Sequence, residues 1–420
     1  MEAEIALHIV IDWGYTYLKL WAIKSNNKIV SSQAICTKEL NSDPSFYSVF
    51  EIINVANIIN EFCSSVSNDD GLLEFSLSSQ MHGLAGYLEH GEPFFSTWND
   101  LPVNKNCGLT IDTFLGIPLL SSMPFYKLEV QRNNYWISTE AILNRYQKKR
   151  QKINCFGTPL QVVMNCIANF KLDASTDYWQ STCLPAKYIK QHDNSTFKAN
   201  INYIKSSLAE NSQIIVHSEI GDLQASTCTA IKESDIVINL GTGSQVIFKP
   251  LTLFPPNFYR IYKNIGKVGV ISHIPCGRLL ADYCMNNKMA FDELIDTISQ
   301  IDYNSFRYYI TQNTSGVLYF PGYNANILEY TNNPIISLFE ISKFPKEVIL
   351  CSWLNQYILI LNELILKEDF GKDVIKIFIV GELGGLSDQA MRLMKELIPE
   401  AFILYKTNET LPISIVKDQL

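Results

Sequence analysis

The sequence predicts an α/β protein made of two related halves. A chain of 420 residues supports two or three domains at about 100–200 residues each. Residues 5–11 are apolar apart from His8, which is typical of a strand buried on both faces. A similar strand–turn–strand unit recurs at residues 236–248. This recurrence indicates a duplicated domain with a cleft between the copies, although a few such hairpins also occur in any α/β protein.

Hydrophobic periodicity predicts the remaining helices and strands. Turn residues follow the first strand at positions 12–14 and return the chain into a second strand. Helical periodicity is present near residues 50–63 and along the apolar stretch 347–366. Further strands are predicted at residues 18–23, 73–77, 214–220, 236–240, 245–248 and 375–380.

Composition excludes several classes of protein. With 47% hydrophobic and 18% charged residues the chain is not disordered, and its net charge of −8 argues against a nucleic-acid partner. The stretch 347–366 is interrupted by Asn355, Asn362 and Glu363, so no membrane partner is expected. Glu2 and Glu4 replace the positive start of a signal peptide. Ten scattered cysteines without a C-x-x-C pair indicate reduced thiols and a cytoplasmic protein.

Two short motifs carry the strongest functional signal. Residues 79–83 read SQMHG and are followed by TWND at 97–100, and residues 221–226 read GDLQAS. In this order they resemble the FGGY carbohydrate kinases, with sedoheptulokinase and xylulokinase most similar. The resemblance implies two ribonuclease-H-like (actin-like ATPase) domains flanking a catalytic cleft. Residues 1–231 would form the sugar-binding domain and 232–420 the nucleotide-binding domain, which ends before the family's last helix.

The GDLQAS motif makes Asp222 the candidate catalytic base. Phosphoryl transfer needs an oriented hydroxyl, a group that accepts its proton, and positive charge or amides around the phosphates. Asp222 follows a predicted strand at the Gly221 turn, where the backbone can pass close to a ligand. The alternative is a helix N-cap, because aspartate caps helices well.

The resemblance also assigns the substrate site. Besides Asp222 it implies that sugar contacts come from five residues of the SQMHG and TWND segments, three of which have a structural alternative. The histidine is otherwise a core residue, the tryptophan a packing residue and the aspartate a turn residue. These candidates are Gln80, Met81, His82, Trp98 and Asp100.

The first hairpin is the candidate magnesium and phosphate site. Asp12 would face the triphosphate through Mg²⁺, since a carboxylate otherwise repels phosphate; a turn aspartate is the alternative. Gly14 and Thr16 would offer an open backbone and a hydroxyl to phosphate. Lys19 matches a cation of the family, or else it is a solvated strand residue.

Two glycine-rich segments of the second half resemble the family's ATP-binding segments. Gly241, Thr242 and Gly243 would let backbone amides approach phosphate, with an ordinary β-turn as the alternative. After the predicted strand 375–380, the segment 381–387 would admit the purine and ribose, or else it is a generic strand-to-helix turn. Its candidate residues are Gly381, Gly384, Gly385 and Ser387.

Several positions depart from the family pattern. Tyr15 and Tyr17 flank Thr16 where small residues are usual, and Leu101-Pro102 replaces a Gly-Arg pair. We expect an ATP- and Mg²⁺-dependent kinase of a pentulose, heptulose or polyol, with a small-molecule sugar as its partner and a homodimer left open. One alternative is a degenerate kinase fold that binds sugar or nucleotide, and another is an actin-like phosphotransferase or ATPase with a different substrate.

Overall fold

The computed structural model is a mixed α/β chain with two compact units. Unit 1 comprises Met1–Ala225, Ile261–Asn264 and Leu411–Leu420, and unit 2 comprises Ser226–Arg260 and Ile265–Thr410. The domain boundary predicted at residues 231 and 232 stays a prediction. The structure describes residues 5–14, 16–40, 49–66, 72–81, 83–97, 100, 110–112, 117–119, 127–132, 134–145, 150–168, 214–217, 219–241, 243–249, 258–262, 265–312, 342–367, 370, 374–381, 383, 385–398 and 401–406.

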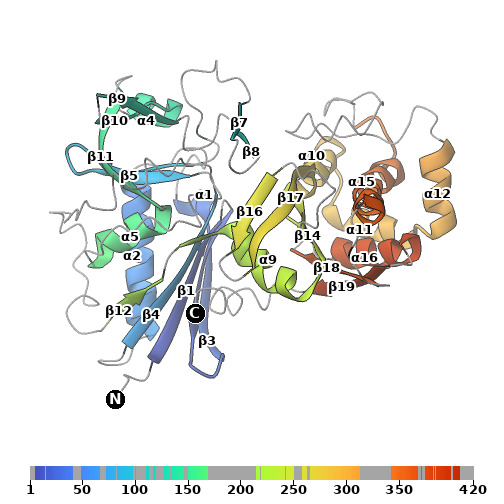
Figure 1. Ribbon diagram of the computed structural model, residues 1–420, viewed down its shortest axis with the longest axis horizontal. Helices are drawn as coiled ribbons and strands as arrows, with labels where there is room; N and C mark the ends of the chain where they lie inside the picture. The colour runs from blue at the N-terminus through green and yellow to red at the C-terminus, as the bar shows by residue number, and fades with distance from the viewer. Residues whose placement is uncertain are drawn as a thin grey trace. The chain divides into compact units, whose positions relative to one another are not determined.

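The main sheet of unit 1 has the strand order β12-β4-β1-β2-β3 (Figure 1). Strand β13 also pairs with β4. Strand β2 runs antiparallel to β1 and β3, whereas β1, β12 and β13 run parallel to β4. The carboxyl ends of β1, β4 and β13 therefore share one edge. The strands are β1 (Ile5–Trp13), β2 (Tyr17–Ile23), β3 (Ile29–Cys36), β4 (Leu72–Ser79), β12 (Ile214–Val216) and β13 (Ile220–Gly221).

Two helices and a second sheet cover one face of this sheet. Helices α2 (Val49–Val66) and α5 (Pro159–Ala168) contribute Ile52, Ile59 and Val163 to a core that also contains apolar residues of both sheets. The second sheet has the order β6-β5-β11-β10-β9. Its strands are β5 (Leu84–Leu88), β6 (Pro93–Ser96), β9 (Leu128–Gln131), β10 (Asn134–Ile137) and β11 (Gln151–Gly157); unit 1 also holds α1 (Thr37–Leu40), α4 (Glu140–Arg145), β7 (Thr110–Asp112) and β8 (Ile117–Leu119).

Unit 2 repeats the strand order of unit 1. Its sheet runs β16-β17-β15-β14-β18-β19, and β14 pairs antiparallel with β15 and parallel with β18. Without β16, this is the order in which β3, β2, β1, β4 and β12 lie in unit 1. The predicted duplication is thus visible as a shared topology. The strands are β14 (Ile236–Leu240), β15 (Gly243–Phe248), β16 (Phe258–Tyr262), β17 (Gly266–Pro275), β18 (Ile375–Val380) and β19 (Ala401–Lys406).

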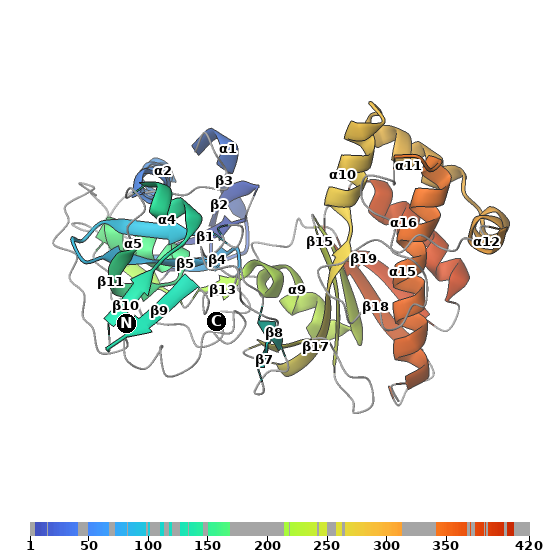
Figure 2. The ribbon, with the colours of Figure 1, turned by 90° about the horizontal axis from the view of Figure 1, so that it is seen from above.

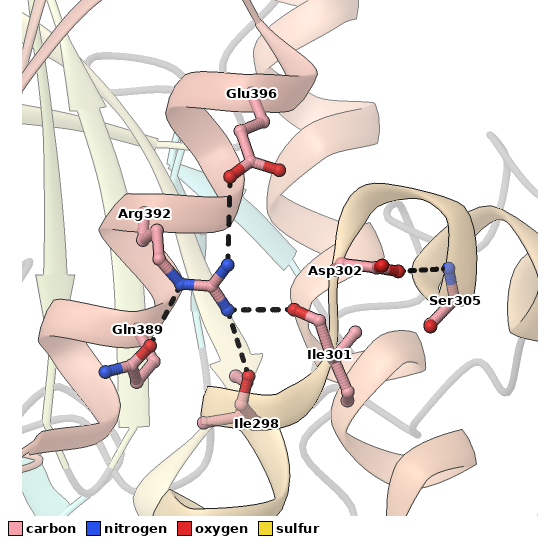
Figure 3. A network of polar contacts seen from close by, with 7 residues as sticks. All are labelled: Ile298, Ile301, Asp302, Ser305, Gln389, Arg392 and Glu396. Atoms are coloured by element: carbon pink, nitrogen blue, oxygen red, sulfur yellow. Dashed lines mark hydrogen bonds and ion pairs between the residues drawn. The ribbon is translucent and has the colours of Figure 1, made fainter.

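Apart from α9, which lies on the other side, the helices of unit 2 pack on one side of its sheet (Figure 2). Their core includes Leu294, Trp353 and Leu393. Arg392 of α16 links this helix to α11, because its guanidinium donates to the carbonyls of Ile298 at 3.2 Å and Ile301 at 2.8 Å (Figure 3). Both carbonyls lie at the carboxyl end of α11, where a helix leaves carbonyls without partners inside the helix. The helices are α9 (Asp222–Glu233), which spans the division between the units, α10 (Gly277–Asn286), α11 (Phe291–Gln300), α12 (Tyr303–Gln312), α15 (Lys346–Lys367) and α16 (Gly385–Leu397).

Helix α15 is long and apolar enough to cross a membrane by length and composition alone. About two thirds of its most apolar window (67%) is buried inside the structure. Trp353, Leu354 and Leu361 are fully buried in the core of unit 2. The helix thus occupies the place of a core helix.

The predicted strands at 18–23, 73–77, 236–240, 245–248 and 375–380 are confirmed. Two predictions need correction. Strand β1 continues through Asp12 and Trp13, which were expected in a turn, because both pair with β4. The strand predicted at 214–220 is two short strands, Ile214–Val216 and Ile220–Gly221; just before the second, the buried Glu219 side chain accepts hydrogen bonds from α5.

Candidate active site

Asp12 and Asp222 come together at the carboxyl edge of the sheet in unit 1. Asp12 lies beside Ser78 in the β1–β4 register, and Gly221 lies beside Ser79 in the β4–β13 register. Parallel strands end at the same edge, so Asp12 and the residue after Gly221 become neighbours. The hydroxyl of Ser78 donates to Asp12 Oδ1 at 2.9 Å, which fixes the orientation of that buried carboxylate.

The environment of Asp222 holds its pKa near neutrality. Burial, and next to it the negative charge of Asp12, raise this pKa from 3.8 to about 7. The backbone N–H groups of Leu223 and Met81 oppose the shift by favouring the ionised form; the Leu223 N–H donates to Asp222 Oδ1 at 2.9 Å. A carboxylate with a pKa near the working pH is well suited to accept a proton from a hydroxyl.

Asp12 fits a magnesium ion as a carboxylate ligand. Mg²⁺ takes oxygen ligands and is usually held by one or two carboxylates together with water and substrate phosphates. Asp12 is 8% exposed, and its like-charge conflict with Asp222 is the kind of strain that a cation relieves. Among the residues that the structure describes, no group of three or more metal-ligating side chains is present.

The hairpin between β1 and β2 places the other first-half ATP candidates beside Asp12. The N–H of Gly14 donates to the Tyr17 carbonyl at 3.0 Å, which closes the hairpin. Thr16 is exposed at its tip, and Lys19 lies directly across from Asp12 on the neighbouring strand. The structure thus groups Asp12, Gly14, Thr16 and Lys19; Tyr15 lies outside the described residues.

The sugar-motif segment is packed against the Asp222 turn. Gln80 donates its N–H to the Trp13 carbonyl at 2.9 Å, and Met81 is buried beside Gly221. A Cβ added to Gly221 would lie 2.7 Å from Met81 Cγ, so a larger residue there would displace the Met81 side chain. Gln80 and Met81 therefore lie with Asp222, while His82 and Trp98 lie outside the described residues.

Asp100 is buried at the start of α4. Its carboxylate accepts hydrogen bonds from the hydroxyls of Ser96 at 2.7 Å and Thr139 at 2.6 Å, and from the N–H of Ala141 at 3.0 Å. These bonds match a helix cap, whereas the alternative expected from the sequence was a turn aspartate. Its contact with a sugar stays a prediction.

Lys127 is fully buried beside this cap. Its ammonium donates to the carbonyls of Ser96, at 3.4 Å, and Thr97. Burial lowers the pKa of Lys127 to about 7, and the charge of Asp100 opposes that change. Sequence reasoning did not identify this residue, because a single lysine before a short strand carries no motif.

In unit 2, the candidate phosphate loop lies between β14 and β15. Gly241 donates its N–H to the Gly243 carbonyl at 3.2 Å, and its own carbonyl accepts from Gly277 at 3.0 Å. A Cβ at Gly277 would come within 2.8 Å of the Gly241 carbonyl oxygen. The start of α10 therefore supports this loop through a glycine that no sequence motif indicated. Thr242 lies outside the described residues.

The candidate adenosine segment begins against the same loop. Gly381 has a φ of +107°, and a Cβ there would lie 2.0 Å from the Leu240 carbonyl oxygen, so only glycine fits. Gly385 begins α16. Ser387 is fully buried, and its hydroxyl has no hydrogen-bond partner among the described residues. Gly384 is not among them, so its placement stays a prediction.

Comparison with solved structures identifies the fold. The xylulose kinase of Lactobacillus acidophilus matches with a TM-score of 0.64 over 98% of this chain and 88% of its own, at 16% identity. The fold is that of the carbohydrate kinases. The gluconate kinase of the same organism gives a TM-score of 0.61 at 15% identity, and the Plasmodium falciparum glycerol kinase with ADP gives 0.59 at 13%, with the same coverage. No protein-family profile and no curated protein matches the sequence.

The carbohydrate-kinase fold confirms the predicted fold class, an α/β chain of the actin-like ATPase type. The structural similarity to carbohydrate kinases covers almost the whole chain. It was expected from the SQMHG and GDLQAS motifs. It does not distinguish among sugars, because the three neighbours are named for xylulose, gluconate and glycerol.

Proposed function

We propose that this protein is an ATP-dependent kinase that phosphorylates a primary hydroxyl of a ketose or polyol. The single observation that carries the proposal is the pairing of Asp12 with Asp222, whose pKa is about 7, at one strand edge of a carbohydrate-kinase fold. Xylulose and sedoheptulose are the first substrates to test, because the SQMHG and GDLQAS motifs resemble those of the corresponding kinases.

In this proposal Asp222 accepts the proton of the sugar hydroxyl. The hydroxyl oxygen forms a bond to the γ-phosphorus while the bond from that phosphorus to the bridging oxygen of ADP breaks. Gln80, Met81 and His82 orient the sugar next to Asp222. Asp12 would hold Mg²⁺, which supplies positive charge to the phosphates when bound.

The remaining candidates bind ATP in the same proposal. Gly14, Thr16 and Lys19 would contact phosphate at the first hairpin, and Gly241 to Gly243 would contact it at the second. The segment that begins at Gly381 would hold adenosine, where close backbone approach is already enforced by glycine.

The deciding experiment is a coupled assay of ADP release across pentuloses, heptuloses and polyols. Sugar-dependent release that requires Mg²⁺ supports the proposal and names the substrate class. Tight sugar or nucleotide binding without such release would instead support a binding module. That alternative is favoured by the bulky Tyr15 and by Leu101-Pro102 in place of a cation.

A further inference from the structure

Glu219 is a fully buried carboxylate that joins three segments of unit 1. Its Oε1 accepts a hydrogen bond from the Ser79 hydroxyl at the end of β4. Its Oε2 accepts from the N–H groups of Leu160, at 2.9 Å, and Gln161, at 3.1 Å, in the first turn of α5. Buried carboxylates need such partners, because an unpaired one is strongly destabilising.

This contact is more than the cap of a helix. The residue before α5 is Thr158, and threonine is a preferred N-cap that can satisfy these N–H groups locally. These N–H groups instead donate to the carboxylate of Glu219, which lies 59 residues after Leu160 and 58 after Gln161 in the chain. A local cap would also leave Ser79 without this contact.

The three segments are those that carry the candidate sugar site and base. Ser79 pairs with Gly221 across β4 and β13 and begins the SQMHG motif. Glu219 is separated from Asp222 only by Ile220 and Gly221. At the start of α5, Pro159 lies next to Gly83, since a Cβ at Gly83 would be 3.5 Å from Pro159 Cγ.

We propose that Glu219 is a positioning residue that holds the Asp222 turn and the SQMHG segment in one fixed arrangement. The proposal rests on the proposed function, in which Asp222 is the base. Burial raises the pKa of Glu219 to about 7, and the Ser79 and α5 donors oppose that rise. A neutral side chain with the same shape can therefore make most of these contacts.

Four variants test the proposal. Glu219→Ala should lower kcat at least tenfold, because a displacement of about 1 Å can cost about 10²-fold in rate, with little change in the KM for ATP. Glu219→Gln should stay within about threefold of the parent kcat, since its amide oxygen still accepts from α5. Ser79→Ala, which removes only one contact, should lower kcat less than Glu219→Ala does. Asp235→Ala is the control: it removes a buried carboxylate of unit 2 that accepts the Lys376 N–H at 3.0 Å, and it should keep the parent kcat.

Hydrogen exchange supplies a readout that does not depend on activity. In Ser79→Ala and Glu219→Ala, amide exchange should become faster in residues 79–83 and 219–225 and stay unchanged in α2. A parent without sugar-dependent ADP release would reject the proposed function, and exchange would then decide the role of Glu219. The proposal is overturned if both variants exchange like the parent. It is also overturned if Glu219→Ala keeps the parent kcat, or if Glu219→Gln loses as much kcat as Asp222→Asn, which would make Glu219 an acid or base itself.

Discussion

Replacing Asp222 by asparagine should remove activity and stabilise the protein at the same time. The variant keeps the size of the side chain but cannot accept the proton of a hydroxyl, so kcat should fall about 10²-fold or more. Raising the pKa from 3.8 to about 7 corresponds to about 4 kcal/mol of unfavourable free energy for the ionised form. Because the side chain is partly exposed, we expect a gain of about 1–3 kcal/mol after solvent screening.

The sign of this effect depends on pH. The pKa is higher in the folded protein than in the unfolded chain, so the cost of ionising Asp222 is absent below about pH 4 and complete above about pH 7. Thermal unfolding without ligands should therefore show Asp222→Asn melting about 2–8 °C above the parent at pH 8 and close to it at pH 4. Asp235→Asn, a buried aspartate of unit 2, is the control and should keep both turnover and its melting behaviour. Near-parent turnover in Asp222→Asn would remove this residue from the mechanism, and equal melting temperatures at pH 8 would refute the electrostatic argument.

Three further predictions concern single residues. His82→Ala should weaken sugar binding by about 1–3 kcal/mol, because a sugar hydroxyl would lose its hydrogen-bond partner, and isothermal titration should show that ATP affinity is unchanged. A loss of stability with normal sugar affinity would instead make His82 a structural histidine. Tyr15→Thr should raise sugar-dependent turnover in steady-state kinetics, since a smaller side chain lets phosphate approach the hairpin amides, whereas a clear loss would mean that the tyrosine hydroxyl makes a needed contact. Gly381→Ala should destabilise unit 2 by about 2 kcal/mol or more, because its Cβ would overlap the Leu240 carbonyl at a positive φ; an unchanged melting temperature would contradict this.

Local patterns predicted the parts of the structure that local physics determines. The apolar run before Asp12 predicts a doubly buried strand, and Ile9 and Val10 are fully buried. Parallel strands end at one edge, which explains why the segments containing Asp12, Gln80 and Asp222 meet, although the sequence analysis predicted no pairing of these strands. The structure brings these three segments together in unit 1.

Contacts between distant segments were not predictable in this way. Glu219 looked like one polar residue at the end of an apolar strand, and only the folded chain shows its side chain reaching α5. Lys127 and Gly277 belong to no motif, since their roles come from neighbours that folding supplies. For Asp100 the motif predicted a contact with a ligand. In the structure its carboxylate accepts three hydrogen bonds from other residues of unit 1.

The strand order of unit 1 has a consequence for synthesis of the chain. Strand β4 is complete at Ser79, but its partners β12 and β13 begin only at Ile214 and Ile220. While the ribosome adds the intervening residues, one edge of β4 lacks the neighbours it has in the finished sheet, and unpaired strand edges promote association between chains. Stalled or truncated translation before Ile214 should therefore yield nascent protein that aggregates unless a chaperone binds it during synthesis.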